Sequence, residues 1–426
     1  MYGYCLMSVV RFILTILALT CIFGTMIDIL NKNITEKYKW LIQFSWYKNG
    51  KTLLTTNLHA DSIPILHGIR FFSIAWVVLG HVCQFSTILP QINYLDVMDN
   101  VRTWRYLIFT NAVLAVDTCF LLSGILLSYI FIKSTENGQQ FNLPVFYLHR
   151  LLRILPVLGL IILLQLSLIS RLGSGPLWDI VMVDGQQKNC EQYWWATLLF
   201  IQNYVNIKDM CVPAAWYLSV DMQMYWFSPI FLLALRRKPK FGIGLLVAAA
   251  ILGIVLAFQQ SYYHLDLASS ISTIVANGKE HIPKKIVALA WTFSFIICIG
   301  VIHWLYPFEQ KDYEYNAVQS SLYLAVARPL WAIGVFLIIF LCHCGYGGKV
   351  YITVIQIQLQ YHHSGLSFIT SILEWKALVP LSRLTFCIYL IHPEVLLSLM
   401  ATTKLPGYMT GLSVVSITFF QKKFSC

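Results

Sequence analysis

The sequence predicts an all-α membrane protein, a polytopic bundle of about nine transmembrane helices. Hydrophobic residues make up 58% of the 426 residues and charged residues only 12%, about half the charged fraction of a typical soluble domain. Several stretches reach the roughly 20 apolar residues that a spanning helix needs. The formal net charge of +11 comes from lysines and arginines in short loops, which indicates membrane orientation rather than nucleic-acid binding.

The expected spans follow one another along the chain. They lie at 8–30, 69–89, 107–132, 151–169, 213–235, 242–258, 286–305, 322–344 and 381–400. The first is a retained span rather than a signal peptide, because it lacks a basic n-region and its apolar run is too long. A further apolar stretch, 195–205, is too short to cross a membrane.

The positive-inside rule orients these spans. The loop 31–68 holds five lysines against two acidic residues, and the basic run RRKPK follows the fifth span at 236–240. Both are expected on the cytosolic side. The loops 170–212 and 306–321 are slightly acidic, so both are expected on the opposite, lumenal side, together with the amino terminus.

The alternation of sides fails at one place. The basic runs 236–240 and 279–285 should both be cytosolic, but only the span 242–258 lies between them. Residues 259–278 are too polar for a second span. Either the charge rule fails here or a helix is missing, and we expect 259–278 to be irregular or re-entrant beside an open groove.

An arginine and a histidine, Arg70 and His81, lie inside one apolar stretch, IRFFSIAWVVLGHV. Their separation is about three helical turns, so both side chains project from one face, roughly 16 Å apart along the axis. Ionisable groups in hydrocarbon are costly and usually face a bundle interior or a polar cavity. The pair suits a site that holds an anionic donor and moves a proton. The alternative is an arginine that reaches the cytosolic interface and a histidine bonded to a carbonyl.

Asp117, in LAVDTCFLLSG, lies near the middle of the next long span, at a depth similar to that of His81. A carboxylate beside an imidazole fixes its tautomer and raises its basicity, as a general base requires. We therefore expect Asp117 and His81 to form a catalytic pair in one polar cavity, within about 12 Å of each other. The alternative is a buried ion pair that holds two helices together.

Arg150 and Arg153, in HRLLRILP, have the i, i+3 spacing that puts both on one helix face at the cytosolic mouth of a span. Paired guanidinium groups suit phosphate or pyrophosphate, because each offers a planar fork of donors. We expect them to line the entrance of the same cavity. The alternative is ordinary positive-inside anchoring.

Two further polar residues lie inside spans. Asp221, in WYLSVDMQ, is about a third of the way down from the lumenal side, and we expect it to face the bundle interior. His392, in IYLIHP, precedes a proline that removes a backbone donor and can kink the last span. Its role is open between structure and function.

The cysteines do not form a disulfide framework, because most fall inside apolar spans. Cys190 and Cys211 differ, since they share one polar loop. If that loop is lumenal, a disulfide between them and two free thiols are equally open alternatives. Cys342-His343-Cys344 and His362-His363 have no second ligand pair at a suitable spacing, so we expect no metal site.

Seven pieces of the chain, taken together, resemble the acyltransferase 3 family, and within it the animal nose-resistant-to-fluoxetine-like membrane proteins. They are LHGIRFFSIAWVVLGH (66–81), AVDTCFLLSGILLSY (115–129), HRLLRILP (149–156), WYLSVDMQMYWFSPI (216–230), LYLAVARPLWAIGVF (322–336), CGYGG (344–348) and PLSRLTFCIYLIHP (380–393). The resemblance runs from about residue 45 to residue 410.

The resemblance implies roles for the candidate residues. Arg70 and His81 are similar to the family's R-x10-H motif, with the histidine as the base. Arg150 and Arg153 are similar to its R-x-x-R motif, which contacts the acyl donor. The expected activity is O-acyl transfer from a cytosolic donor such as acyl-coenzyme A, a co-substrate rather than a bound cofactor, with Arg70 also holding the donor. The alternatives are a lipid or small-molecule transport protein and an inactive relative of the family.

The same resemblance implies the partners and the location. The acceptor is a hydroxyl of a lipid or glycan, nucleic acid is not a partner, and the protein is a multi-pass protein of an endomembrane or the plasma membrane. We expect an amino-terminal span with a basic cytosolic loop at 1–68, the acyltransferase-like domain at 69–400, and a truncated carboxyl-terminal segment at 401–426.

The chain also departs from the family pattern. A cysteine-rich lumenal domain before the first span is absent, and so is a span with a Tyr-Thr-Arg-like motif between Gln260 and Ile274. Residues 349–364 have the character of an insertion. We therefore expect one or two spans fewer than the family standard, from an incomplete or misassembled coding sequence.

Overall fold

A computed structural model describes most of the chain. The described residues are 2–30, 39–58, 63–89, 91–138, 141–260, 284–314, 316–343 and 368–404. They fall into two compact units whose boundaries pass through two of the long helices. Unit 1 comprises Met1–Ser62, Leu148–Val220 and Lys376–Leu405, and unit 2 comprises Ile63–Tyr147, Asp221–Trp375 and Pro406–Cys426. Each unit is described by itself.

Eight of the described helices are long and apolar enough to cross a membrane. They are α1 (Tyr2–Leu30), α4 (Ile65–Ile88), α7 (Val113–Glu136), α8 (Leu143–Ser167), α11 (Ala215–Arg237), α14 (Lys284–Trp304), α15 (Ala317–His343) and α17 (Leu378–Thr402). In hydrocarbon the backbone must satisfy its own hydrogen bonds, so long apolar runs form helices. The predicted all-α polytopic bundle is confirmed.

A ninth apolar helix, α12 (Pro239–Gln260), lies where the span 242–258 is expected. Its apolar stretch among the searched residues is Pro239–Ala249, which is shorter than a full crossing. The expectations about 259–278, about the insertion at 349–364 and about the carboxyl-terminal segment fall wholly or mostly outside the described residues, and so do Cys344, His362 and His363.

Shorter helices join the spans. In unit 1 these are α2 (Lys39–Ile42), α3 (Trp46–Leu54), η2 (Ile169–Arg171), η3 (Asp179–Gln187), α9 (Lys188–Leu198) and α10 (Gln202–Val205). In unit 2 they are α5 (Tyr94–Val101), α6 (Leu107–Thr110), η4 (Tyr306–Glu309) and α16 (Phe368–Leu373).

Unit 1 is organised along α17, whose two ends contact different connecting segments. Near its first residues, the Arg383 guanidinium donates hydrogen bonds to backbone carbonyls at the end of α3. Near its last residues, Ala401 packs with Trp178 and Met182, just before and inside η3. The helix α3 and the segment that contains η3 therefore lie at opposite ends of α17.

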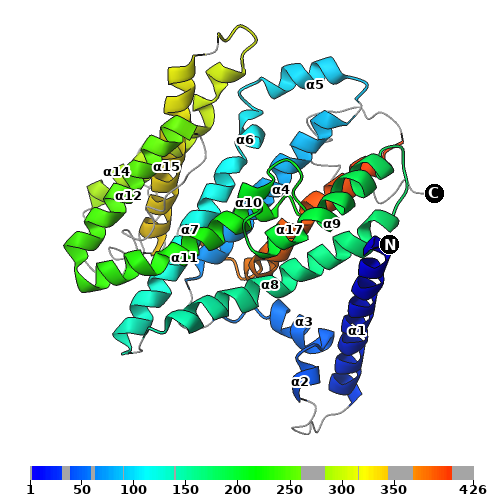
Figure 1. The fold of residues 1–426 in the computed structure, drawn as a ribbon. Helices are drawn as coiled ribbons and strands as arrows, with labels where there is room; N and C mark the ends of the chain where they lie inside the picture. The colour runs from blue at the N-terminus through cyan, green and yellow to red at the C-terminus, as the bar shows by residue number, and fades with distance from the viewer. Residues whose placement is uncertain are drawn as a thin grey trace, which may run out of the picture. The chain divides into compact units, whose positions relative to one another are not determined.

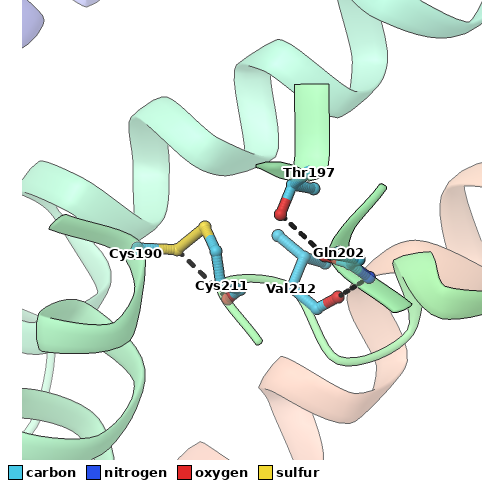
Figure 2. The surroundings of a disulfide bond; sticks show 5 residues. All are labelled: Cys190, Thr197, Gln202, Cys211 and Val212. Carbon is cyan, nitrogen blue, oxygen red and sulfur yellow. Dashed lines mark hydrogen bonds between the residues drawn. A yellow bond between two sulfur atoms is a disulfide. The ribbon is translucent and has the colours of Figure 1, made fainter. Parts of the chain in front are cut away.

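The segment between α8 and α11 is closed by a disulfide between Cys190 and Cys211, whose Cα atoms are 4.0 Å apart (Figure 2). Both cysteines are fully buried. Within the loop, Thr197 Oγ1 donates to Gln202 Oε1 at 2.7 Å, and Gln202 Nε2 donates to the Val212 carbonyl at 3.2 Å. The loop is thus a packed element with its own buried polar contacts.

The core of unit 2 joins α4, α7, α14 and α15. Its buried apolar residues include Leu66, Leu122, Trp291 and Trp331, and α14 and α15 lie side by side (Figure 1). The side chain of Asn111, just before α7, ties these helices together. Its Nδ2 donates to the Ile302 carbonyl at 2.8 Å, and its Oδ1 accepts from the Tyr323 hydroxyl at 3.2 Å.

Two glycines of α4 allow close contacts within unit 2. A side chain at Gly68 would overlap the backbone of Leu373 in α16, and one at Gly80 would overlap the Ala112 methyl group at the start of α7. The first contact fixes where α16 packs on α4. The second fixes the register between α4 and α7.

Gly68→Ala should destabilise the protein by about 1–3 kcal/mol, because the added methyl group meets backbone atoms that cannot rotate away. The matched control is Gly300→Ala in α14, where nothing lies within 4 Å of the added carbon. Alanine there should be neutral or slightly stabilising, since glycine disfavours helices. Thermal unfolding of the purified protein in detergent measures both, and equal effects would contradict the Gly68 contact.

Candidate functional site

A cluster of charged side chains lies inside the membrane-spanning part of unit 2. Asp117, on α7, is only 7% exposed, and its Oδ1 lies 3.9 Å from Nη1 of Arg328 on α15. This distance is that of an ion pair rather than of a hydrogen bond. The Arg328 side chain is 24% exposed, so the pair sits mostly away from the surface of the unit.

A second carboxylate, that of Asp221 on α11, belongs to the same cluster. It is 8% exposed and accepts a hydrogen bond of 2.9 Å from the hydroxyl of Ser123 on α7. The charges of Arg70, Asp117 and Asp221 all act on the thiol of Cys119, one turn of α7 before Ser123. The prediction that Asp221 faces the interior agrees with this burial.

The cluster combines two guanidinium groups, Arg70 and Arg328, with two carboxylates, Asp117 and Asp221. The four side chains come from four helices, and their formal charges cancel. Charged groups inside a membrane are tolerated when they pair with one another and face the bundle interior. The ion pair of Asp117 with Arg328 joins α7 to α15, and the hydrogen bond of Ser123 with Asp221 joins α7 to α11.

A tryptophan holds Arg328 in position. Trp331, one turn along α15 from Arg328, donates from Nε1 to Thr118 Oγ1 at 2.9 Å, and both side chains are buried. Thr118 directly follows Asp117. The hydrogen bond between Trp331 and Thr118 thus fixes α15 against α7 beside the ion pair.

His81 is half-buried on α4, and its ring centroid lies 6.2 Å from that of Phe85. The contact between Gly80 and Ala112 places the start of α7 beside it. Consecutive spans run in opposite directions, so Asp117, five residues further along α7, lies about 7.5 Å from that contact. Asp117 is therefore opposite the part of α4 between Arg70 and His81.

This register differs from the equal depth expected for His81 and Asp117. Side chains on a helix lean toward its amino terminus, so His81 leans toward the level of Asp117, and Asp117 leans toward the level of His81. Asp117 forms an ion pair with Arg328. A catalytic pairing of Asp117 with His81 stays a prediction.

Arg150 and Arg153 belong to unit 1, in the first half of α8. Arg150 is half-buried and Arg153 is exposed, and their spacing keeps them on one face of the helix. Whether they bind a donor or anchor the helix stays a prediction.

His392 also belongs to unit 1 and lies buried on α17. Its Nδ1 lies 3.1 Å from the Ile388 carbonyl, an acceptor, so Nδ1 carries the proton and Nε2 has the lone pair in the neutral ring. The ring centroids of Tyr389 and His392 are 5.7 Å apart, and those of Tyr217 and Tyr389 are 5.3 Å apart.

Sequence reasoning missed two polar groups, one half-buried and one buried. Arg328 lies within an apolar run of α15, and an arginine inside such a run is enough to indicate a residue that faces the bundle interior. Glu394, two residues after His392, is 4% exposed. Gln165 of α8 lies close to its carboxyl group. Within the described part of the chain, no group of three or more His, Cys, Asp or Glu residues could hold a metal.

Comparisons with known proteins agree with this picture. The sequence model of the acyltransferase 3 family, an acyltransferase domain, matches residues 63–420. Nose resistant to fluoxetine protein 6 of Caenorhabditis elegans is 26% identical over 84% of this chain and 48% of its own length. Regulator of hypoxia-inducible factor 1 of the same organism is 24% identical over 49% of this chain and 41% of its own length.

A bacterial relative is named "Putative O-acetyltransferase" in Staphylococcus aureus (strain COL). It is 23% identical over 43% of this chain and 27% of its own length. The chain thus spans about half the length, or less, of these relatives. No solved structure matches.

The ion pair between Asp117 and Arg328 should show energetic coupling in a double-mutant cycle. Asp117→Asn and Arg328→Gln should each destabilise the protein, because each leaves a partner charge uncompensated in a low-dielectric interior. The double variant should lose less stability than the two single variants lose together. The difference, measured by thermal unfolding, should be a coupling free energy of about 0.5–3 kcal/mol.

The matched control is the exposed pair of Asp99 and Lys311 in unit 2. Its atoms are closer, at 2.6 Å, but both side chains are more than half exposed. The hydrogen bond and charge of Lys311 lower the pKa of Asp99, yet water screens such a pair, so no measurable coupling is expected. Additive effects at Asp117 and Arg328 would contradict the proposed pairing.

Proposed function

This chain belongs to the acyltransferase 3 family, and from that premise we propose that it is a membrane O-acyltransferase. The acyl group would pass from a cytosolic donor such as acyl-coenzyme A to a hydroxyl of a lipid or glycan. The family match over most of the chain carries this proposal, and the "Putative O-acetyltransferase" relative supports it. The eight apolar helices fit a multi-pass protein that works within a bilayer.

In the proposed reaction, His81 acts as the general base. Its imidazole takes the proton of the acceptor hydroxyl while the hydroxyl oxygen attacks the thioester carbonyl carbon. The carbon–sulfur bond then breaks, the new ester forms, and the imidazolium returns the proton to the departing thiolate. Such assistance typically contributes about 10²–10⁴-fold.

Asp117 is proposed as a positioning residue for His81. The contact with Arg328 supports this role, because it holds the Asp117 carboxyl group in place. An ionised carboxylate near the imidazole would stabilise the imidazolium formed during the reaction.

Arg150, Arg153 and Arg70 are proposed to hold the phosphates of the donor. The paired N–H groups of each guanidinium can donate two parallel hydrogen bonds to phosphate oxygens. The disulfide supports the sidedness, since disulfides persist in oxidising compartments. If the segment between α8 and α11 lies outside the cytosol, then α8, which leads into it, begins on the cytosolic side with Arg150 and Arg153 in its first half.

His81→Ala should reduce acyl transfer by about 10² or more, because the acceptor hydroxyl loses its base. The measurement is transfer of label from acyl-coenzyme A to a panel of lipids and glycans by the purified full chain. The control is His303→Ala, an exposed histidine of α14 whose Nδ1 contacts the Ile299 carbonyl, which should keep full activity. Retained activity of a correctly inserted His81→Ala protein would exclude His81 as the base.

Arg153→Ala should raise the KM for acyl-coenzyme A about tenfold and leave the KM for the acceptor nearly unchanged, since a charge-assisted hydrogen bond to phosphate is lost. Arg153→Lys keeps the charge but not the fork and should recover part of the affinity. Equal losses for donor and acceptor would instead indicate a structural role of Arg153.

A further inference from the structure

We propose that α3 is an interfacial helix whose exposed face binds anionic phospholipids of the cytosolic leaflet. The argument rests on how α3 is held, on which residues it exposes, on its charge and on the side at which it lies. All of these contacts are within unit 1.

Both ends of α3 are fixed. At its start, Ser45 Oγ accepts from the Lys48 amide at 3.2 Å and donates to Asp28 Oδ2 of α1 at 2.6 Å. At its end, Arg383 Nη1 donates to the carbonyls of Thr52 and Leu53 at 2.8 and 2.9 Å. A guanidinium at a helix carboxyl end also compensates the helix dipole. The helix is therefore a rigid platform docked beside the end of α1 (Figure 1).

The face of α3 that is turned away from these contacts is apolar and exposed. Trp46, Tyr47 and Leu54 fall within about 100° of one another around the helix. Trp46 is 65% exposed and Leu54 is 68% exposed. Trp40 and Phe44, just before α3, are exposed as well. Aromatic rings beside a spanning helix are typical of the membrane–water interface.

The charge of this segment is all of one sign. Residues 39–58 contain Lys39, Lys48 and Lys51 and no aspartate or glutamate. Around the helix, Lys51 lies about 40° from the edge of the apolar arc and Lys48 about 100° from it, and both are exposed. An amphipathic helix with lysines beside an aromatic face lies in the headgroup region and prefers anionic lipids.

The side of the membrane follows from α17. It contacts α3 at one end and the disulfide-containing segment at the other. Because disulfides persist outside the cytosol, α3 lies at the cytosolic end, where the leaflet carries anionic phospholipids.

The test is hydrogen–deuterium exchange of residues 46–54 in the full chain, reconstituted in nanodiscs of phosphatidylcholine with or without phosphatidylserine. Exchange should be at least about fivefold slower with phosphatidylserine, the factor that one lysine near an anionic surface supplies. High salt should reduce the difference by screening. Equal exchange in the two lipids would overturn the proposal.

Matched variants identify the contacts. Lys48→Gln with Lys51→Gln should abolish the lipid difference, whereas Lys238→Gln with Lys240→Gln, lysines outside α3, should leave it unchanged. The reverse pattern would overturn the assignment to α3. As an independent measurement, benzoylphenylalanine in place of Trp46 should crosslink to phosphatidylserine, and a crosslink to a second copy of the chain would show that protein covers this face.

Discussion

The cost of charge in hydrocarbon is the constraint on which unit 2 depends. Arg70, Asp117, Asp221 and Arg328 lie in four apolar helices, where an isolated charge would be expelled or neutralised. The structure pairs Asp117 with Arg328 and gives Asp221 a hydrogen bond from Ser123. The packing of α7 against α11 and α15 thus depends on polar contacts as well as on apolar burial.

This arrangement separates two kinds of polar residue. The Asp117–Arg328 ion pair is suited to holding a site in shape. His81 lies further along α4, beside the tight contact of Gly80 with Ala112. A half-buried imidazole next to a fixed charge cluster can accept and return a proton without disturbing the pairs that hold the helices together. This division of roles fits acyl transfer, in which one base serves both steps.

Much of the fold could be predicted from the sequence, because spanning helices depend on local apolar length. The expected span at 69–89 begins at Ile65 in the structure, the one expected at 107–132 begins at Val113, and the one expected at 151–169 begins at Leu143. The resemblance to the acyltransferase 3 family is confirmed by the match over residues 63–420. Both results depend on short stretches of sequence, which can be read without knowing how the chain folds.

The site was less predictable, because the spacing of residues along the sequence does not show which residues of different helices contact each other. Arg70, Asp117 and Asp221 stand out as charges inside apolar runs, but the partner of Asp117 is Arg328, more than two hundred positions later. Similarly, the contact of Gly80 with Ala112, which brings the start of α7 beside α4, depends on the fold and could not be inferred from sequence spacing. Likewise, the sequence alone could not decide whether Cys190 and Cys211 form a disulfide, because the distance between them depends on how their loop folds.

The central claim is that the acyl group is transferred beside His81 and the charge cluster of unit 2. The most direct measurement is an electron cryo-microscopy structure of the full chain in nanodiscs with a non-hydrolysable acyl-coenzyme A analogue. The account predicts the acyl carbon close to the His81 imidazole, with the ion pair of Asp117 and Arg328 intact. An analogue whose acyl group lies away from His81 would contradict it.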